Sequence, residues 1–313
     1  MKKIKTKSGL DIDNRSEESS LVHDPYTGHW IILAPGRKHR PDNSSSRKNE
    51  DVFSRQNLKH EKILAVYGRG AECITAIENK FSVFSSNKGL KGRQEILVEG
   101  QSKMPFSKFS VDMIFSVINA LVERSHVFRR NPQIKYLVAF KNQGAAAGAS
   151  QIHAHSQIFG LSFVPEQAGK MMQKRRQLLK KTKLTPHDLA LMMATKERII
   201  FNDKKVIAFA SPFARLPYEV RIITQRPLDN ITQTDKYERR SIAKALFKIL
   251  HLTSSRDWPF NFYFHDTFSD KNEHFEIVFT PRTNVWAGFE LDTDIVINPV
   301  APESCADEYR KAG

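Results

Sequence analysis

The stretch NQGAAAGASQIHAHSQIF, residues 142–159, joins a run of small residues to two histidines that stand two positions apart. We expect its second part, 151–159, to form a strand. Because side chains alternate between the two faces of a strand, His153, His155 and Gln157 would share one face. Two imidazoles and an amide in a row make a poor core face, since every buried polar group needs a hydrogen-bond partner. The small side chains of the preceding loop would let a phosphate approach its backbone N–H groups.

This pattern suits nucleophilic histidine chemistry on the α-phosphate of a nucleotide. A neutral imidazole offers a lone pair on one ring nitrogen while a backbone carbonyl holds the N–H of the other. His155 would attack the phosphorus, and Gln157 would hold the phosphoryl oxygens. The spacing alone leaves three other interpretations: a metal pair, since H-x-H is common in zinc sites, two structural histidines, or a coincidence of composition.

Outward from this stretch, the chain alternates strand and helix patterns. We expect strands at 30–33, 73–77, 81–84, 94–98 and 136–140. Apolar residues at helical spacing predict a helix over 108–128, and a second helical stretch covers 235–252.

The order of these patterns repeats, which indicates a tandem duplication. The segments around 83–98 and 152–155 resemble those around 208–222 and 273–276. Glu95 precedes His153 by 58 residues and Glu219 precedes His274 by 55. We therefore expect an α+β protein of two related halves, each an antiparallel sheet with flanking helices, although short strand patterns can also resemble each other by chance. The expected divisions are a flexible tail over 1–20, a first half over 21–165, a basic helical connector over 166–200 and a second half over 201–313.

The charge of the chain indicates an anionic partner. It has 313 residues, with 49 Lys and Arg against 34 Asp and Glu, a net charge of +15. Nucleic acid, an anionic lipid surface and phosphorylated small molecules all fit that balance. The basic run over 170–183 contains no aromatic residue that could stack on bases, so we interpret it as a solvated helix face. This disfavours nucleic acid as a partner without excluding it.

The cysteines and the apolar runs restrict the location of the protein. Cys73 and Cys305 stand far apart, so no disulfide framework and no four-cysteine zinc site is available. We expect a reducing, cytoplasmic setting. The basic N-terminus is followed by no apolar core of a signal peptide, and no apolar run approaches the length of a membrane span, so we expect no membrane association.

The segment GASQIHAHSQI, residues 148–158, resembles the G-A-S-x-x-H-P-H-S-Q signature of the galactose-1-phosphate uridylyltransferase branch of the histidine-triad (HIT) superfamily. Four other segments are similar to motifs of that branch and occur in the same order. They are DPYTGHWIILAPGRKHRP at 24–41, ENKF at 78–81, SPFARLPYE at 211–219 and PRTNVWAGFE at 281–290. The resemblance spans about 22–305.

The resemblance implies HIT-like halves and a role for each matching residue. His155 would form a covalent nucleotidyl-histidine, and Gln157 stands where the hydrolase branch places another histidine, which favours transfer. The resemblance also implies His153 and Ser150 as catalytic residues. It implies that the nucleotide and phosphates contact Arg37, Arg40, Asn79, Asn142 and Gly148, and that the sugar contacts Phe289 and Glu290. In dimeric relatives the sugar segment crosses to the other subunit, so a homodimer is implied.

The implied reaction moves UMP or AMP from a sugar nucleotide to a hexose 1-phosphate or to phosphate. The substrates would be nucleotide sugars and sugar phosphates. Two alternatives stay open: phosphorolysis of an ADP-sugar or a dinucleoside polyphosphate, and a catalytically lapsed relative that binds nucleotide or nucleic acid.

The chain departs from the family at its metal sites. The cysteine pairs are missing, Lys103 and Pro227 stand where ligand histidines would fall, and the second-half strand reads His274-Phe-Glu276. One remaining imidazole, that of His153, cannot hold zinc. We therefore predict no metal and no other cofactor, with salt bridges and apolar packing in place of the metal.

Overall fold

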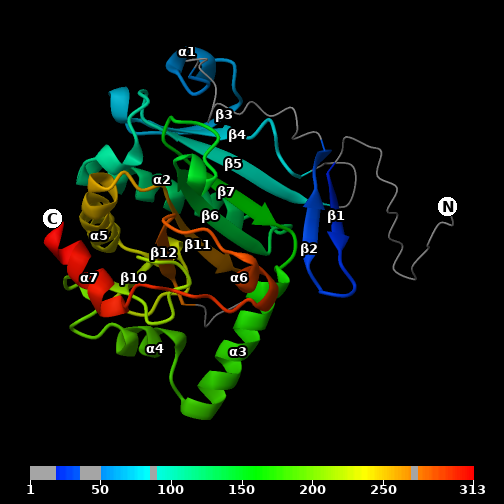
Figure 1. The fold of residues 1–313 in the computed structure, drawn as a ribbon. Coiled ribbons are helices and arrows are strands. Elements are labelled where there is room, and N and C mark those ends of the chain that lie inside the picture. The colour runs from blue at the N-terminus through cyan, green and yellow to red at the C-terminus, as the bar shows by residue number, and fades with distance from the viewer. Residues whose placement is uncertain (1–18, 36–50, 85–89, 269–273) are drawn as a thin grey trace.

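Ten strands of the described chain form one continuous antiparallel sheet (Figure 1). The computed structural model describes residues 19–35, 51–84, 90–268 and 274–313. The first half supplies β3 (Ile63–Tyr67), β4 (Ile74–Glu78), β5 (Gly92–Glu99), β6 (Tyr136–Gln143) and β7 (His155–Leu161). The second half supplies β8 (Ile199–Asn202), β9 (Val206–Ala210), β10 (Val220–Thr224), β11 (Phe260–Thr267) and β12 (Glu276–Pro281). The order across the sheet is β3-β4-β5-β7-β6-β11-β12-β10-β9-β8, so the second five strands repeat the first five in reverse.

The two halves meet where β6 pairs with β11. Equivalent residues of the two halves lie opposite each other there. Phe140 on β6 lies opposite Tyr263 on β11. Gln157 lies opposite Phe140, and Val278 lies opposite Tyr263. The repeated topology agrees with two related α+β halves. One detail differs from the expectation of a separate sheet in each half. The sheets of the two halves join into one, because β6 and β11 satisfy each other's backbone N–H and C=O groups.

Two long helices cover one face of this sheet. α2 (Val111–Arg129) and α5 (Lys236–Ser255) lie side by side there, and the C-terminal α7 (Pro302–Lys311) packs beside them (Figure 1). Each long helix begins at a side-chain cap: Ser110 Oγ accepts from the Met113 N–H, and Asp235 and Glu238 form a capping box. Their buried faces join the sheet in one apolar core that spans both halves, so the two expected long helices are confirmed.

The opposite face is covered only in part. α1 (Arg55–Leu58) and the residues before it cover β4 and β5, and α4 (Pro186–Met193) covers β9 and β10. α3 (Glu166–Thr182) projects from the body of the molecule, and α6 (Gly288–Thr293) follows β12 (Figure 1). The sheet surface between these covers is where the polar side chains lie. Across the described residues, no helix combines the length and the apolar composition needed to cross a membrane.

The structure differs from the expected elements at one strand and adds detail at two expected divisions. The expected strand over 81–84 is a turn, because the Asn79 side chain accepts from the Phe81 N–H and the Ser82 hydroxyl accepts from the Phe84 N–H. The connector over 166–200 holds two helices and then the start of β8. The expected tail over 1–20 overlaps β1 (Ser20–His23), which pairs with β2 (Trp30–Leu33) as a separate hairpin.

Gly160 on β7 allows the close approach of α2 to the sheet. A Cβ atom at Gly160 would lie 2.5 Å from Phe128 Cδ1 and 3.1 Å from Ile134 Cγ2. We expect Gly160→Ala to lower the free energy of unfolding by about 1–3 kcal/mol, because it overpacks the core. As a control, Gly169→Ala on α3, where the new Cβ meets nothing within 4 Å beyond its chain neighbours and the helix's own backbone, should raise it by about 0.5–1 kcal/mol. Urea denaturation measures both, and equal stability of the two variants would contradict the expectation.

Candidate active site

His155 begins β7 on the face of the sheet that α2 and α5 do not cover. β6 and β7 pair Lys141 with Ser156, and this register places Asn142 beside His155. The pairing of β6 with β11 places Asn261 opposite Asn142. A row of polar side chains thus runs across three neighbouring strands, from both halves of the chain.

The imidazole of His155 is held in one orientation. Its Nδ1 lies 2.9 Å from the main-chain oxygen of His153, and because a carbonyl only accepts, Nδ1 carries the proton. The neutral ring then has its lone pair on Nε2. The side chain is buried, and the Phe53 ring lies 5.2 Å from it, centroid to centroid. This is the tautomer that a nucleophilic Nε2 requires.

Gln157 lies two residues further along the same face, and a second amide orients it. Gln94 Nε2 donates to Gln157 Oε1 at 3.2 Å, while Gln94 Oε1 accepts from the Val83 N–H. Because its oxygen is used as an acceptor, Gln157 presents its NH₂ group as a donor. Such a preorganised donor can stabilise charge on a phosphoryl oxygen.

The strand expected over 151–159 begins too early, although the rings of His153 and His155 both lie beside Phe53, with centroids 6.0 and 5.2 Å from it. β7 begins only at His155, and His153 precedes it in irregular backbone. Its Nδ1 contacts Asp51 Oδ2 at 2.9 Å and its Nε2 contacts the Gly100 carbonyl oxygen at 3.1 Å. Both ring nitrogens are engaged, so His153 acts as an anchor whose main-chain oxygen holds His155.

The small-residue loop turns back over the polar row. Gly144 and Gly148 both adopt positive φ, 84° and 79°, which non-glycine residues rarely do. Asn261 Nδ2 donates to Asn142 Oδ1 and to the Ala147 carbonyl oxygen, each at 2.8 Å. These bonds fasten the loop to Asn142 and bring Gly148 close to its amide nitrogen. Ser150 ends the loop five residues before His155.

A small apolar slot lies on one side of His155, over β4 and β5. Its volume is about 90 Å³, and Phe53, Ile77, Ile96, Asn79 and Phe81 line it. Asn79 is buried there. This predicted nucleotide-contacting residue therefore lies in the slot, whose rim also includes the charged residues Glu61, Glu78 and Lys80.

A larger polar cavity lies on the other side, over β6, β11 and β12. It has a volume of about 490 Å³ and includes Asn142, Asn261, Arg221, Arg282 and Trp286. Burial raises the pKa of Glu219, which also lines it, and raises the pKa of Tyr263 to about 12. Sequence reasoning missed these second-half residues as neighbours of His155, because only the pairing of β6 with β11 brings them together.

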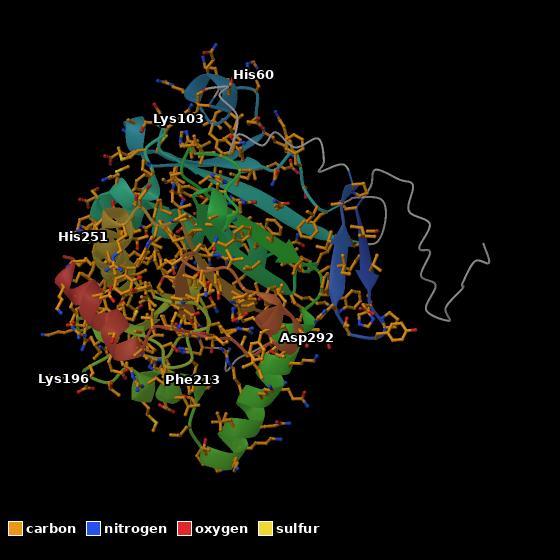
Figure 2. The ribbon with its side chains drawn as sticks, viewed as in Figure 1. His60, Lys103, Lys196, Phe213, His251 and Asp292 are labelled. Carbon is orange, nitrogen blue, oxygen red and sulfur yellow. The ribbon has the colours of Figure 1, made fainter. Side chains whose placement is uncertain are left out.

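The predicted sugar residues do not join this cavity. Phe289 and Glu290 lie on α6, the helix that Asp292 marks in Figure 2. Glu290 Oε2 accepts from the Ala287 N–H and so caps the helix. The Phe289 side chain is half exposed. Arg37 and Arg40 lie outside the described residues.

The side chains at the positions of the family's metal sites do not fit a metal ion. Within the described ranges, no group of three or more His, Cys, Asp or Glu is placed to hold one. In the second half, the Glu276 carboxylate is paired with Arg221 at 2.8 Å and lies 3.8 Å from Arg175. His274 lies beside His187, with ring centroids 5.4 Å apart. Two guanidinium groups thus lie against Glu276, and Arg221 also pairs with Glu219 at 3.3 Å, so these carboxylates already have cationic partners.

Burial makes His274 sensitive to acid. It lowers the pKa of His274 to about 4, opposed in part by Glu276. Between that value and the ordinary value of about 6.5, the unfolded chain binds a proton that the folded protein does not. We therefore expect the free energy of unfolding to fall by about 3 kcal/mol as pH drops from about 6.5 to 4.

The His274→Gln variant should lose this part of the pH dependence. His60→Gln is the control, since His60 is exposed beyond α1 (Figure 2). Urea denaturation between pH 4 and 7 measures the difference. An unchanged slope in His274→Gln would show that other groups cause the acid sensitivity.

Comparison with known proteins gives the same fold. The family model described as Domain of unknown function (DUF4921) matches residues 102–312, and the DUF4931 N-terminal domain matches 37–164. The chain is 24% identical to ADP-glucose phosphorylase of Arabidopsis thaliana, over 97% of this chain and 95% of that one. It is 22% identical to galactose-1-phosphate uridylyltransferase of Thermotoga maritima, over 93% and 98%.

Solved structures agree with these sequence matches. The crystal structure of the Arabidopsis thaliana ADP-glucose phosphorylase with bound ADP-glucose superposes with a TM-score of 0.77 at 23% identity, over 95% of this chain and all of that one. A uridylyltransferase structure gives a TM-score of 0.77 at 20% identity, over 93% and 97%. The resemblance inferred from the motifs and the expected α+β fold are confirmed.

Proposed function

The chain belongs to the family described as Domain of unknown function (DUF4921), and from its site we propose a nucleotidyltransferase that moves UMP or AMP from a sugar nucleotide through a nucleotidyl-His155 intermediate. The acceptor is a hexose 1-phosphate or inorganic phosphate. The observation that carries this proposal is the hydrogen bond from His155 Nδ1 to the His153 carbonyl oxygen, which leaves Nε2 as the nucleophile. The names of the relatives support it.

In the first step, His155 Nε2 attacks the α-phosphorus in line with the leaving oxygen. The P–N bond forms, the P–O bond to the sugar phosphate breaks, and its electron pair leaves with that oxygen. The proton stays on Nδ1, where the His153 carbonyl stabilises the imidazolium charge. In the second step an acceptor phosphate oxygen attacks the same phosphorus and the P–N bond breaks. Each displacement inverts phosphorus, so the two together retain its configuration.

The groups around His155 supply the binding sites. The Gln157 amide and the backbone N–H groups of the loop around Gly148 and Ser150 hold the phosphoryl oxygens. Asn142 lies beside the nucleophile to hold a further oxygen. The apolar slot with Asn79 takes the base, and the cavity beyond Asn142 takes the sugar phosphate. By resemblance, Arg37 and Arg40 add positive charge to the phosphate site.

This arrangement divides the work between the proposed halves. The half over 21–165 carries the nucleophile and the slot for the nucleobase. The half over 201–313 supplies most of the polar cavity, and 166–200 connects the two halves. Because Phe289 and Glu290 do not line that cavity, we propose a homodimer in which this segment completes the sugar site of the other subunit. Both cysteines, Cys73 and Cys305, are free thiols, which supports a reducing, cytoplasmic location.

Phosphorolysis of an ADP-sugar is the second candidate reaction. It uses the same intermediate but an adenine base and inorganic phosphate as the acceptor. The similarity to the ADP-glucose phosphorylase over 97% of the chain favours it.

The test is covalent labelling of the wild-type protein. UDP-glucose, UDP-galactose and ADP-glucose, each radiolabelled at the α-phosphorus, are incubated with it separately. We expect a protein-bound label that survives base and is lost in acid, as a phosphoramidate is. Release of the label by hexose 1-phosphate or by phosphate then identifies the acceptor. If none of the three donors labels the protein at saturating concentration, the proposed function is wrong.

A further inference from the structure

A buried ion pair lies directly behind His155, on the helix-covered face of the sheet. Lys141 on β6 and Glu99 at the end of β5 pair through Nζ and Oε2 at 2.6 Å. Their side chains are 1% and 0% exposed. The Phe106 ring lies 4.5 Å from Nζ. A buried ion pair is weak evidence for stability, because apolar residues of the same size often do as well, so this pair calls for another explanation.

The pair holds three consecutive residues around the nucleophile. The Glu99 backbone N–H donates to the Ala154 oxygen at 3.0 Å. Lys141 Nζ donates to the His155 main-chain oxygen, also at 3.0 Å. The Ser156 hydroxyl donates to Glu99 Oε1 at 2.6 Å. The ion pair therefore connects β5 and β6 to the first residues of β7 through side chains.

These bonds lie where the strand pairing ends. β7 pairs with β5 only as far as the Val98–His155 pair, and with β6 only as far as the Lys141–Ser156 pair. The nucleophile thus stands at the first residue of its strand, where little regular pairing fixes it. Lys141 also directly precedes Asn142, which lies beside His155 on the other face.

We propose that Lys141 and Glu99 are positioning residues that hold His155 and Asn142 in the geometry required for attack. The inference rests on the proposed function, since it assumes that His155 is the nucleophile. A shift of about 1 Å in a reacting group can cost about 10²-fold in rate. A methionine at 141 could fill the space but could not donate to the His155 carbonyl.

The chain contains a matched control. Arg124 on α2 binds Glu95 through two hydrogen bonds of 2.7 Å, and both side chains are buried. Glu95 lies on β5, four residues before Glu99 and opposite Ile158, further from the strand start. Removing Arg124 or Lys141 takes a buried cation from a buried carboxylate, although Glu95 keeps the partly exposed Arg93 at 2.6 Å, so both variants lose stability. Only Lys141 contacts the main chain of the nucleophile.

The experiment compares Lys141→Met with Arg124→Met at a temperature at which circular dichroism shows both to be folded. The single-turnover rate of labelling on His155 and the Kd for the nucleoside monophosphate are measured. We expect about 10²-fold slower labelling in Lys141→Met with the Kd little changed, and a rate near the wild-type one in Arg124→Met. Equal rates in the two variants would overturn the proposal.

Two further arms keep the test decisive. If Lys141→Met does not fold, Glu99→Gln keeps the shape of the side chain, removes its charge, and should also slow labelling.

Nitrogen-15 NMR of the imidazoles reports the tautomer of His155 without any substrate. Wild-type protein should carry the proton on Nδ1, and loss of Lys141 should shift the population toward Nε2–H. An unchanged tautomer together with unchanged labelling refutes the positioning role. If the wild-type protein takes no label, the proposed function fails, and the tautomer alone decides whether Lys141 positions His155.

Discussion

Replacing His155 by alanine should lower kcat by about 10⁴-fold or more, because the covalent route is lost with its nucleophile. The backbone of β7 and the binding cavities stay in place, so nucleotide should still bind. The measurement is steady-state transfer together with covalent labelling from a sugar nucleotide. Covalent labelling is the more sensitive of the two measurements, since the variant should carry no acid-labile label.

His251→Ala is the matched control for this substitution. His251 is exposed on α5, away from β7 (Figure 2). Its loss should leave transfer and labelling unchanged. Equal labelling of His155→Ala and the wild-type protein would show that another residue is the nucleophile.

Replacing Arg124 by methionine should lower the free energy of unfolding by about 3–5 kcal/mol, the range for a buried ion pair that loses one partner. Glu95, with a fully buried side chain, would keep only Arg93, which approaches it at 2.6 Å and is partly exposed. Urea denaturation measures the change. Arg240→Met is the surface comparison, since its partner Asp112 is mostly exposed, and it should cost less than about 1 kcal/mol.

The double variant Arg124→Met and Glu95→Met separates the ion pair from packing. Because it removes both charges, it should recover much of the stability that the single variant loses. If the double variant is less stable than Arg124→Met alone, the buried carboxylate is not the cause of the loss.

Local pattern was enough to predict the two long helices and the strands β2, β4, β5, β6 and β7. The helical spacing of apolar residues predicted α2 and α5. The structure adds their N-terminal caps, Ser110 and Asp235. The strand over 81–84 was wrong, because the side-chain oxygens of Asn79 and Ser82 accept hydrogen bonds from backbone N–H groups two residues on and turn the chain there. Such local bonds compete with strand pairing and leave little trace in hydropathy.

The repeat was visible in the sequence, but its register was not. Glu95 pairs with Ile158 on β7, and Val220 pairs with Phe279, the equivalent residue on β12. Glu95 therefore corresponds to Val220, and matching it with Glu219 is off by one residue. A shift of one residue moves a side chain to the other face of a sheet. Glu95 thus faces Arg124 of α2, whereas Glu219 lies with Arg221 at the polar cavity.

The sequence by itself determined the chemical groups of the candidate site and their spacing along one strand: the imidazole of His155, the amide of Gln157 and the glycines that let the loop turn. Those features depend on residue type and on neighbours in the chain. Only the tertiary structure decided what stands around them. Asn261 lies 119 residues from its partner Asn142, and Glu99 lies 42 residues from Lys141. Contacts at such separations depend on strand order and register. These are fixed when one face of the whole sheet is buried under α2 and α5.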